Sequence, residues 1–192
     1  MGNNASNVVV GKPLATGGIL VAPLGTPLPV DDTEPLDAAF QPVGYVADAG
    51  LEKDEKREAD TIKAWGGDTI AAIQKSFGVD WAFSFAEFLS VVAQRAMYGD
   101  ANVIATPATA TVGAKLHVIG TSTPAPHKSW VFEMFHDTQR IRIVVPDAQI
   151  TAVDKVSFKD ADIAANPITL TSFPDTNGAY FHEYADDGKP LA

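Results

Sequence analysis

Residues 77–99, FGVDWAFSFAEFLSVVAQRAMYG, change their hydrophobic period part-way along. At the start, Val79, Trp81 and Phe83 alternate with small or polar residues, which is the pattern of a half-buried β-strand. From position 85 onward the apolar residues recur every three or four positions, which is the pattern of an amphipathic helix. The stretch therefore predicts a strand that leads directly into one α-helix, at about residues 85–98.

The residues around this helix match the signals that begin and end helices. Ser84 stands at the N-cap position and Glu87 follows three residues later, so the pair predicts a capping box. Phe83 and Phe88 flank the cap at the positions of a hydrophobic staple, and Gly99 is a favourable C′ residue. No second segment has comparable helix signals. Because a single helix with one apolar face needs a sheet to cover, the chain is expected to be mainly β, within the α+β class.

The totals of the sequence exclude several classes of protein. At 192 residues the chain suits one domain with an appended segment. Its net charge of −10 argues against tight binding to nucleic-acid phosphates, which needs clustered lysine and arginine. The absence of cysteine excludes disulfides, thiol catalysis and cysteine-based zinc sites. No apolar run approaches the roughly 20 residues that span a bilayer, so no membrane association is expected.

Residues 1–42 differ in composition from the rest and are expected to form an extended N-terminal arm. Prolines, glycines and asparagines preclude long regular elements there, yet two apolar runs interrupt the segment. One interpretation is a frayed terminus. The other is an arm that becomes ordered when its apolar runs add to the sheet edge of a neighbouring subunit. That interpretation assigns the contact between subunits to Val8, Val9, Val10, Ile19, Leu20 and Val21.

Strand signals continue through residues 43–184, and a short polar tail follows at 185–192. The clearest hairpin covers residues 129–145, and Pro146 is expected to end its second strand. Further strands are predicted at 43–46, 61–65, 69–77, 112–119 and 150–158. About eight antiparallel strands in a sandwich or closed barrel, with one flanking helix, account for this pattern.

Two turns and one charged segment complete the predicted organisation. Gly78 is expected to turn the chain ahead of the strand that precedes the helix. Asn177-Gly178 predicts a final hairpin between residues 168–173 and 179–184. The mixed-sign run LEKDEKREAD at residues 51–60 is usually a solvated loop or an exposed helical turn, and it is too balanced in sign for a nucleic-acid patch.

The sequence offers no pattern for catalysis, cofactor binding or metal binding. Phosphate-binding glycine motifs and a GxSxG elbow are absent, and His117, His127, His136 and His182 lack metal-ligand spacing. With 24 acidic residues, pairs of carboxylates are always available and therefore say little. The three tryptophans, which are more often core or interface residues than a platform for sugars, are Trp65, Trp81 and Trp130.

Several short blocks together resemble the major tail tube protein of long-tailed bacteriophages, particularly those of actinobacterial hosts. These blocks are Gly44-Tyr45-Val46, Gly50-Leu51, Ile62-Lys63-Ala64-Trp65-Gly66-Gly67-Asp68 and Ile168-Thr169-Leu170-Thr171-Ser172-Phe173-Pro174-Asp175 with Gly178. The resemblance runs from about residue 44 to residue 184, and the N-terminal arm carries no matching motif.

The resemblance implies a β-sandwich or barrel whose copies form hexameric rings that stack into a tube. The arm and the charge run around Asp54, Glu55 and Glu58 would then bridge neighbouring rings. The acidic balance suits a conduit through which duplex DNA passes without tight binding. Tape-measure, tail-terminator and baseplate or tip proteins are the implied partners. The implied location is the virion tail, which would be assembled in the host cytoplasm. The resemblance implies no catalytic role for the protein.

Two alternatives from other classes stay open at this stage. The first is a monomeric β-sandwich that recognises a carbohydrate or a protein on a surface, using the tryptophans. The second, which the sequence favours less, is an enzyme with a carboxylate pair. A tube protein of a contractile tail or secretion apparatus would share the architecture of the main prediction.

Overall fold

The computed structural model describes residues 8–14 and 18–189. Most strands join one large antiparallel sheet with the order β2-β1-β7-β8-β9-β4-β3, and β10 also pairs with β8. The strands of this sheet are β1 (Ile19–Pro23), β2 (Gln41–Pro42), β3 (Glu52–Lys63), β4 (Thr69–Phe85), β7 (Lys128–His136), β8 (Gln139–Val153), β9 (Asn166–Phe173) and β10 (His182–Asp186). The other elements are α1 (Val91–Tyr98), a 3₁₀ helix (Asp100–Asn102), and β5 (Val103–Thr106) paired with β6 (Lys115–Val118).

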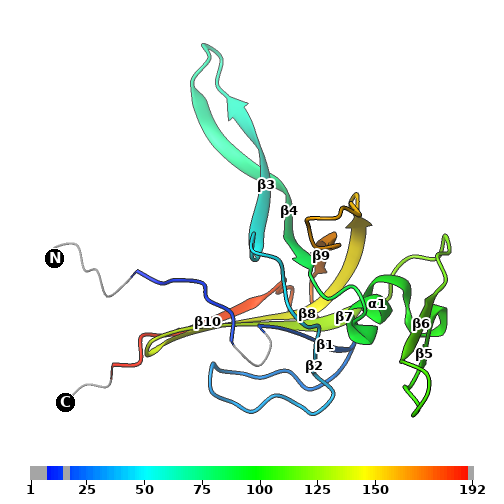
Figure 1. Ribbon diagram of the computed structural model, residues 1–192. Coiled ribbons are helices and arrows are strands. Elements are labelled where there is room, and N and C mark those ends of the chain that lie inside the picture. The colour runs from blue at the N-terminus through cyan, green and yellow to red at the C-terminus, as the bar shows by residue number, and fades with distance from the viewer. Residues whose placement is uncertain (1–7, 15–17, 190–192) are drawn as a thin grey trace.

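This architecture confirms the predicted fold class, which is mainly β and antiparallel with one α-helix. The main sheet has β2 and β3 at its two edges, so it is open and does not close into a barrel. In Figure 1 the ladder of β7, β8 and β10 extends to one side, while the β3/β4 hairpin rises away from the body. None of the described helices is long and apolar enough to cross a membrane.

The core lies where the second half of β4 crosses β7, β8 and β9. Trp81, Phe83 and Phe85 are buried at alternate positions, as the sequence pattern predicts. The ring of Trp81 packs 5.0 Å from that of Phe132 on β7, measured between centroids. Burying each such side chain contributes roughly 1.5–3 kcal/mol, so this aromatic cluster fixes how β4 lies on the sheet.

The helix starts six residues later than the caps around residue 84 predict. The predicted start at Ser84 is wrong, because β4 continues to Phe85 in register with β9. The N-cap is Ser90, whose hydroxyl accepts a hydrogen bond from the Ala93 N–H at 3.3 Å. Glu87 instead accepts a hydrogen bond from the Tyr45 backbone N–H at 2.8 Å, over the glycine at position 44, where a Cβ would collide with its carboxylate. The predicted end is confirmed, since Gly99 is the C-cap.

The hairpin of β7 and β8 is confirmed, but Pro146 does not end its second strand. β8 runs from Gln139 to Val153 through the proline. The pairing with β7 shifts by one residue between Lys128 and Trp130, so β8 carries an extra residue there and Pro146 lies in this bulge, where a proline is tolerated. On the other side Pro146 faces the gap between β9 and β10. Neither neighbouring strand therefore needs a backbone N–H from residue 146, which proline lacks.

The predicted final hairpin does not form. β9 and β10 do not pair with each other, because both lie antiparallel to β8 along the same edge, β9 against its second half and β10 against its first. Residues 174–181 form an inserted loop between them. The Asn177-Gly178 turn is real, with Gly178 at a φ of 83° and its N–H bonded to the Asp175 carbonyl. It bends this loop rather than joining paired strands.

The charge run also adopts an unexpected structure. Residues 52–63 form β3, not a loop or a helical turn, and Gly78 lies inside the continuous strand β4 rather than at a turn. The two strands pair from Glu52 opposite Ala82 to Lys63 opposite Thr69, with two bulges. The turn between them contains Trp65 and two glycines.

Candidate assembly site

The β3/β4 hairpin is exposed on both faces over most of its length (Figure 1). Every residue of β3 is exposed, as are residues 69–76 of β4. β9 pairs with β4 only from Asp80 onward, so the outer part of the hairpin is a two-stranded ribbon. The other edge of β3 has no partner strand in the described chain. Both edges of this ribbon therefore present backbone groups to a possible partner.

A polar ladder ties the base of the hairpin to the sheet. Lys56 Nζ lies 2.5 Å from Asp80 Oδ2, and the Thr171 hydroxyl donates to Asp80 Oδ1 at 2.8 Å. Thr151 and Thr171 are joined by a hydrogen bond of 2.8 Å between their hydroxyls. Partial burial opposes ionisation of Asp80, but the hydrogen bonds from Lys56 and Thr171 and the charge of Lys56 outweigh it and lower the pKa of Asp80. The ladder links β8, β9, β4 and β3.

The opposite face of the hairpin base rests on the loop between β9 and β10. The ring of Phe77 meets that of Tyr180 edge-on, with centroids 4.9 Å apart. Lys53 Nζ lies 4.6 Å from the centre of the Phe181 ring and 2.9 Å from Glu183 Oε2. Burial lowers the pKa of Lys53, but the contacts with Glu183 and Glu55 outweigh it and leave that pKa raised. This loop therefore supports the hairpin from the side.

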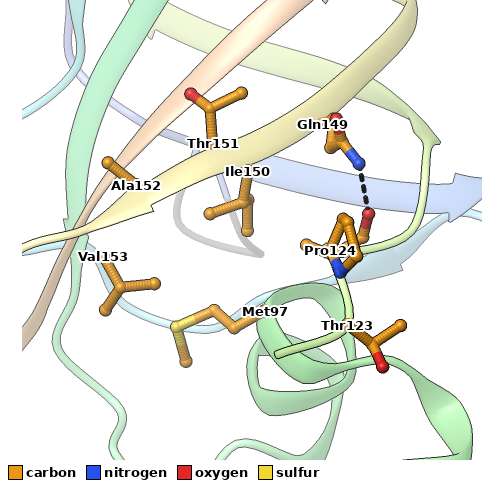
Figure 2. Close-up of a pocket in the computed structure, with 9 residues that line it drawn as sticks. Met97, Thr123, Pro124, Gln149, Ile150, Thr151, Ala152 and Val153 are labelled. Carbon is orange, nitrogen blue, oxygen red and sulfur yellow. Dashed lines mark hydrogen bonds between the residues drawn. The ribbon is translucent and has the colours of Figure 1, made fainter. Parts of the chain in front are cut away.

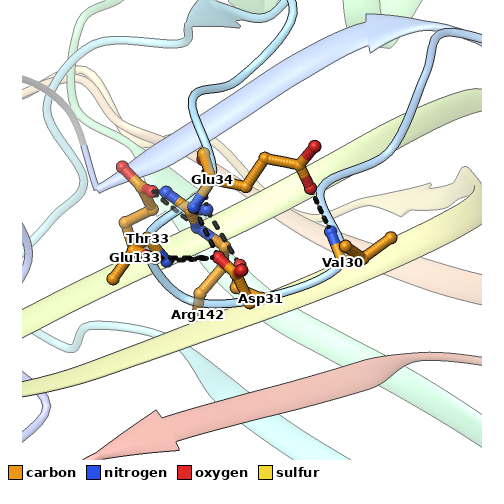
Figure 3. A network of polar contacts seen from close by, with 6 residues as sticks. All are labelled: Val30, Asp31, Thr33, Glu34, Glu133 and Arg142. Atoms are coloured by element: carbon orange, nitrogen blue, oxygen red, sulfur yellow. Dashed lines mark hydrogen bonds and ion pairs between the residues drawn. The ribbon is translucent and has the colours of Figure 1, made fainter.

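A buried arginine fixes the segment between β1 and β2 (Figure 3). Arg142 donates from Nε and Nη2 to Glu133 Oε1 at 2.9 and 2.5 Å, and from Nη1 to the carbonyl oxygens of Asp31 and Glu34 at 3.0 and 2.7 Å. Asp31 Oδ1 accepts the backbone N–H groups of Glu34 and Thr33, and these bonds lower the pKa of Asp31. The sequence-based prediction missed this site, because Arg142 lies 111 and 108 residues from Asp31 and Glu34 along the chain.

Two of the cavities on the described surface are lined in part by α1. The larger, which we call the loop groove, has a volume of about 410 Å³ and lies between Met97 of α1, residues 123–125 and the second half of β8 (Figure 2). The Gln149 amide nitrogen donates to the Ala125 carbonyl at 2.6 Å on its wall. The smaller has a volume of about 250 Å³ and is lined by α1, β6 and Asn166, and we call it the helix cavity. Among the described residues no group of acidic or histidine side chains is arranged to hold a metal ion.

The residues predicted to contact other subunits lie in two separate parts of the molecule. Val8, Val9 and Val10 are exposed, and the chain just after them pairs with β7 through Pro13 and Met134. Asp54, Glu55 and Glu58 share β3, where Asp54 and Glu58 point to one face and Glu55 to the other. In the sheet order β7 and β3 are separated by β8, β9 and β4.

The apolar run that contains Ile19, Leu20 and Val21 forms β1, which pairs with β7 of the same chain. Ile19 and Val21 are buried in the core of this chain. Trp81 and Trp130 are buried as well, so the three tryptophans do not form a surface platform. Trp65, at the tip of the hairpin, is the exposed one.

Comparison with known families decides the class of the protein. The model of a family described as phage tail tube protein matches residues 1–190. The chain belongs to this family. This tail tube protein is thus a structural component of a virion tail.

Solved structures similar to this tail tube protein come from contractile injection systems. The cap of the anti-feeding prophage, described as the AFP tube terminating cap, shares 14% identity at a TM-score of 0.48, covering 97% of this chain and 100% of that one. A chain of the PVC sheath-tube complex in its extended state shares 12% (TM-score 0.41; 96% and 100% covered), and one of the PVC sheath/tube terminator shares 13% (0.42; 91% and 99%). No curated protein matches the chain.

Proposed function

We propose that this tail tube protein is the repeating subunit of the tube, assembling into hexameric rings that stack and conduct the genome DNA. The observation that carries the proposal is the β3/β4 ribbon, which is exposed on both faces. Between Asp80 and the tip of the hairpin, neither edge of the ribbon pairs with another strand of the described chain. A two-stranded ribbon alone is marginally stable in water. Its 12-residue strand β3 extends about 40 Å at the usual rise per residue, which is long enough to reach another copy.

The proposed contact joins copies head to tail, and an arrangement of this kind produces a tube rather than a closed dimer. The hairpin of one copy would meet a different surface of the next, and such a heterologous contact generates rings when its rotation closes and filaments when it does not. Charged side chains along β3 discourage random edge pairing, so the ribbon is selective for its intended partner.

The residues proposed for contacts between subunits follow from exposure. Asp54, Glu55 and Glu58 on β3 bridge rings through the hairpin, and Val8, Val9 and Val10 contribute from the N-terminal arm. The run Ile19, Leu20 and Val21 acts by anchoring this arm, since two of its side chains are buried within the chain.

The charge of the chain supports passage of DNA without tight binding. At a net charge of −10 per subunit, a tube repels phosphates and lets the duplex slide. We further propose a long non-contractile tail of a phage of an actinobacterial host, assembled in the host cytoplasm, with tape-measure, terminator and baseplate proteins as partners. These last assignments rest on the sequence resemblance alone.

Trimming the hairpin tests the proposal. Residues 59–75 are replaced by Asn-Gly, which keeps the pairing from Glu52–Ala82 to Glu58–Ser76 and leaves the core untouched. We expect the full chain to form rings and tubes in negative-stain images at high concentration, and the trimmed chain to remain monomeric with an unchanged melting temperature. Tubes formed by the trimmed chain, or a full chain that stays monomeric, would falsify the proposal.

A further inference from the structure

The tip of the hairpin carries a large apolar side chain, that of Trp65, which is exposed to solvent. The indole of Trp65 is fully exposed, at 106% relative accessibility, the highest value among the large apolar side chains of the described residues. Two glycines with φ of 121° and 100° follow it, and the Gly67 N–H donates to the Ala64 carbonyl at 3.0 Å. A tight turn thus presents the indole at the far end of the ribbon. Burial of the indole against apolar side chains of a partner would therefore stabilise the contact.

The helix cavity has the size and lining for one such side chain. Its apolar walls come from Phe88, Leu89, Tyr98, Leu116 and Val118. Its volume of about 250 Å³ is below the roughly 300–1,000 Å³ of pockets for small-molecule ligands, and it matches a single large side chain better.

One buried polar atom at the helix cavity lacks a partner. Asn166 lines the cavity with 3% of its surface exposed, and its Nδ2 is buried without a hydrogen bond to any described residue. An unsatisfied buried donor is destabilising, so an occupant that supplies an acceptor is favoured. The hairpin turn uses the carbonyls of Ala64 and Asp68 for its own hydrogen bonds, which leaves those of Trp65 and its neighbouring glycine to accept.

The surface beside the helix cavity extends the apolar contact. Leu89 and Phe158 are 76% and 72% exposed, and the Phe158 ring meets the Phe88 ring edge-on with centroids 5.7 Å apart. An indole seated in the cavity would thus be flanked by apolar side chains at the rim. The loop groove is a poorer match, because it is larger and its wall amide, that of Gln149, already has a partner.

We infer that Trp65 of one copy inserts into the helix cavity of a second copy. In Figure 1 the hairpin rises away from the body of the molecule, whereas α1 and β6, which line the helix cavity, lie at the side of the body. The tip of the hairpin therefore does not reach the helix cavity of its own chain. The inference rests on the proposed tube and names the surface that receives the hairpin. Each copy then provides one tip and one cavity, which is the head-to-tail arrangement that an extending assembly needs.

Cross-linking between single-cysteine variants tests the contact, since the chain has no cysteine of its own. Asp68→Cys lies beside the tip and Leu89→Cys at the rim of the helix cavity, and both positions are exposed. In assemblies made from a mixture of the two, we expect a short bis-maleimide to give the mixed dimer as the main product. The matched control pairs Asp68→Cys with Thr123→Cys at the loop groove, and we expect no mixed dimer from it.

A second measurement asks whether the indole itself matters. Trp65→Ala is expected to weaken assembly roughly tenfold or more without changing the melting temperature, whereas Ile70→Ala, exposed on the same hairpin, should leave assembly unchanged. Equal loss in both variants, or a cross-link to position 123 in place of 89, would overturn the inference while tubes still form. If the full chain forms neither rings nor tubes, the proposed function itself is wrong.

Discussion

At the scale of single residues, the guanidinium of Arg142 is a buried charge that requires several hydrogen-bond partners. It is 8% exposed and binds the carboxylate of Glu133 on β7 and two carbonyl oxygens of residues 31–34, so its partners come from two separate segments. A buried charge of this kind is tolerated only when all its partners are present. Arg142 therefore determines the position of residues 31–34, which cover this part of the sheet.

Removing this arginine should be costly. Arg142→Ala is expected to lower the free energy of unfolding by about 3–5 kcal/mol, because it leaves the carboxylate of Glu133 poorly exposed and unpaired. Urea denaturation measures the change. Glu133→Gln in the Arg142→Ala background should recover part of the loss. Lys75→Ala, which breaks the exposed pair with Asp60, is the matched control and should cost less than about 1 kcal/mol. Equal losses in the two single variants would contradict the assigned role.

At the scale of elements, local patterns predicted the second half of β4 and the β7/β8 hairpin, because their side chains alternate between core and surface. They placed the helix start wrongly because two serines precede it, and only pairing with β9 decides that Ser84 belongs to a strand. The pairing of β9 and β10 with β8 was equally invisible, since a strong Asn-Gly turn signal does not reveal which strands it connects.

The exposed β3/β4 hairpin is a second element that local sequence patterns did not predict in full. A run of mixed charges has no apolar face, so nothing in residues 52–60 indicates a strand, and only the end of β3 falls within the strand predicted at 61–65. The charged part is a strand because it pairs with β4. The role of the acids in this run stays a prediction. The sequence missed the cavities, because the loop groove is formed by α1, residues 123–125 and β8, and the helix cavity by residues 88–89, α1, β6 and Asn166.

The base of this hairpin should make stability depend on pH. The pKa of Asp80 is lowered in the folded state, so its ionised form contributes stability that is present above the unfolded pKa of about 3.9 and is lost as the pH falls through the lower folded value. We expect urea midpoints measured from pH 6 down to pH 3 to fall less steeply in Asp80→Asn than in the unmodified chain. Asp68→Asn, at the hairpin tip, is the control. An unchanged slope in Asp80→Asn would show that this ladder does not stabilise the fold.

At the scale of the whole molecule, the N-terminal region has two parts with different roles. β1 supplies Ile19, Val21 and Ala22 to the buried sheet, so residues 19–23 are part of the folded domain. Val8, Val9 and Val10 are exposed and precede the pairing at Pro13. The composition of residues 1–42 is similar throughout, and for this reason the sequence alone could not separate the two parts.

Truncations should distinguish these parts. Removal of residues 1–10 is expected to keep the melting temperature while reducing tube length in negative-stain images, because it takes away the exposed valines and spares the contacts of Lys12 and Leu14 with β7. Removal of residues 1–40 should lower the melting temperature strongly, since it also deletes β1. If the shorter truncation assembled as well as the full chain, the arm would have no part in the tube.

The interruption between β9 and β10 has a consequence for evolution. Each strand is held by β8 independently, so residues 174–181 can gain or lose length without shifting the register of either. The same residues carry the aromatic rings on which the hairpin leans. Insertions there would change the tilt of the ribbon while leaving the sheet intact, so related phages could adjust the spacing of their tubes at a single tolerant position.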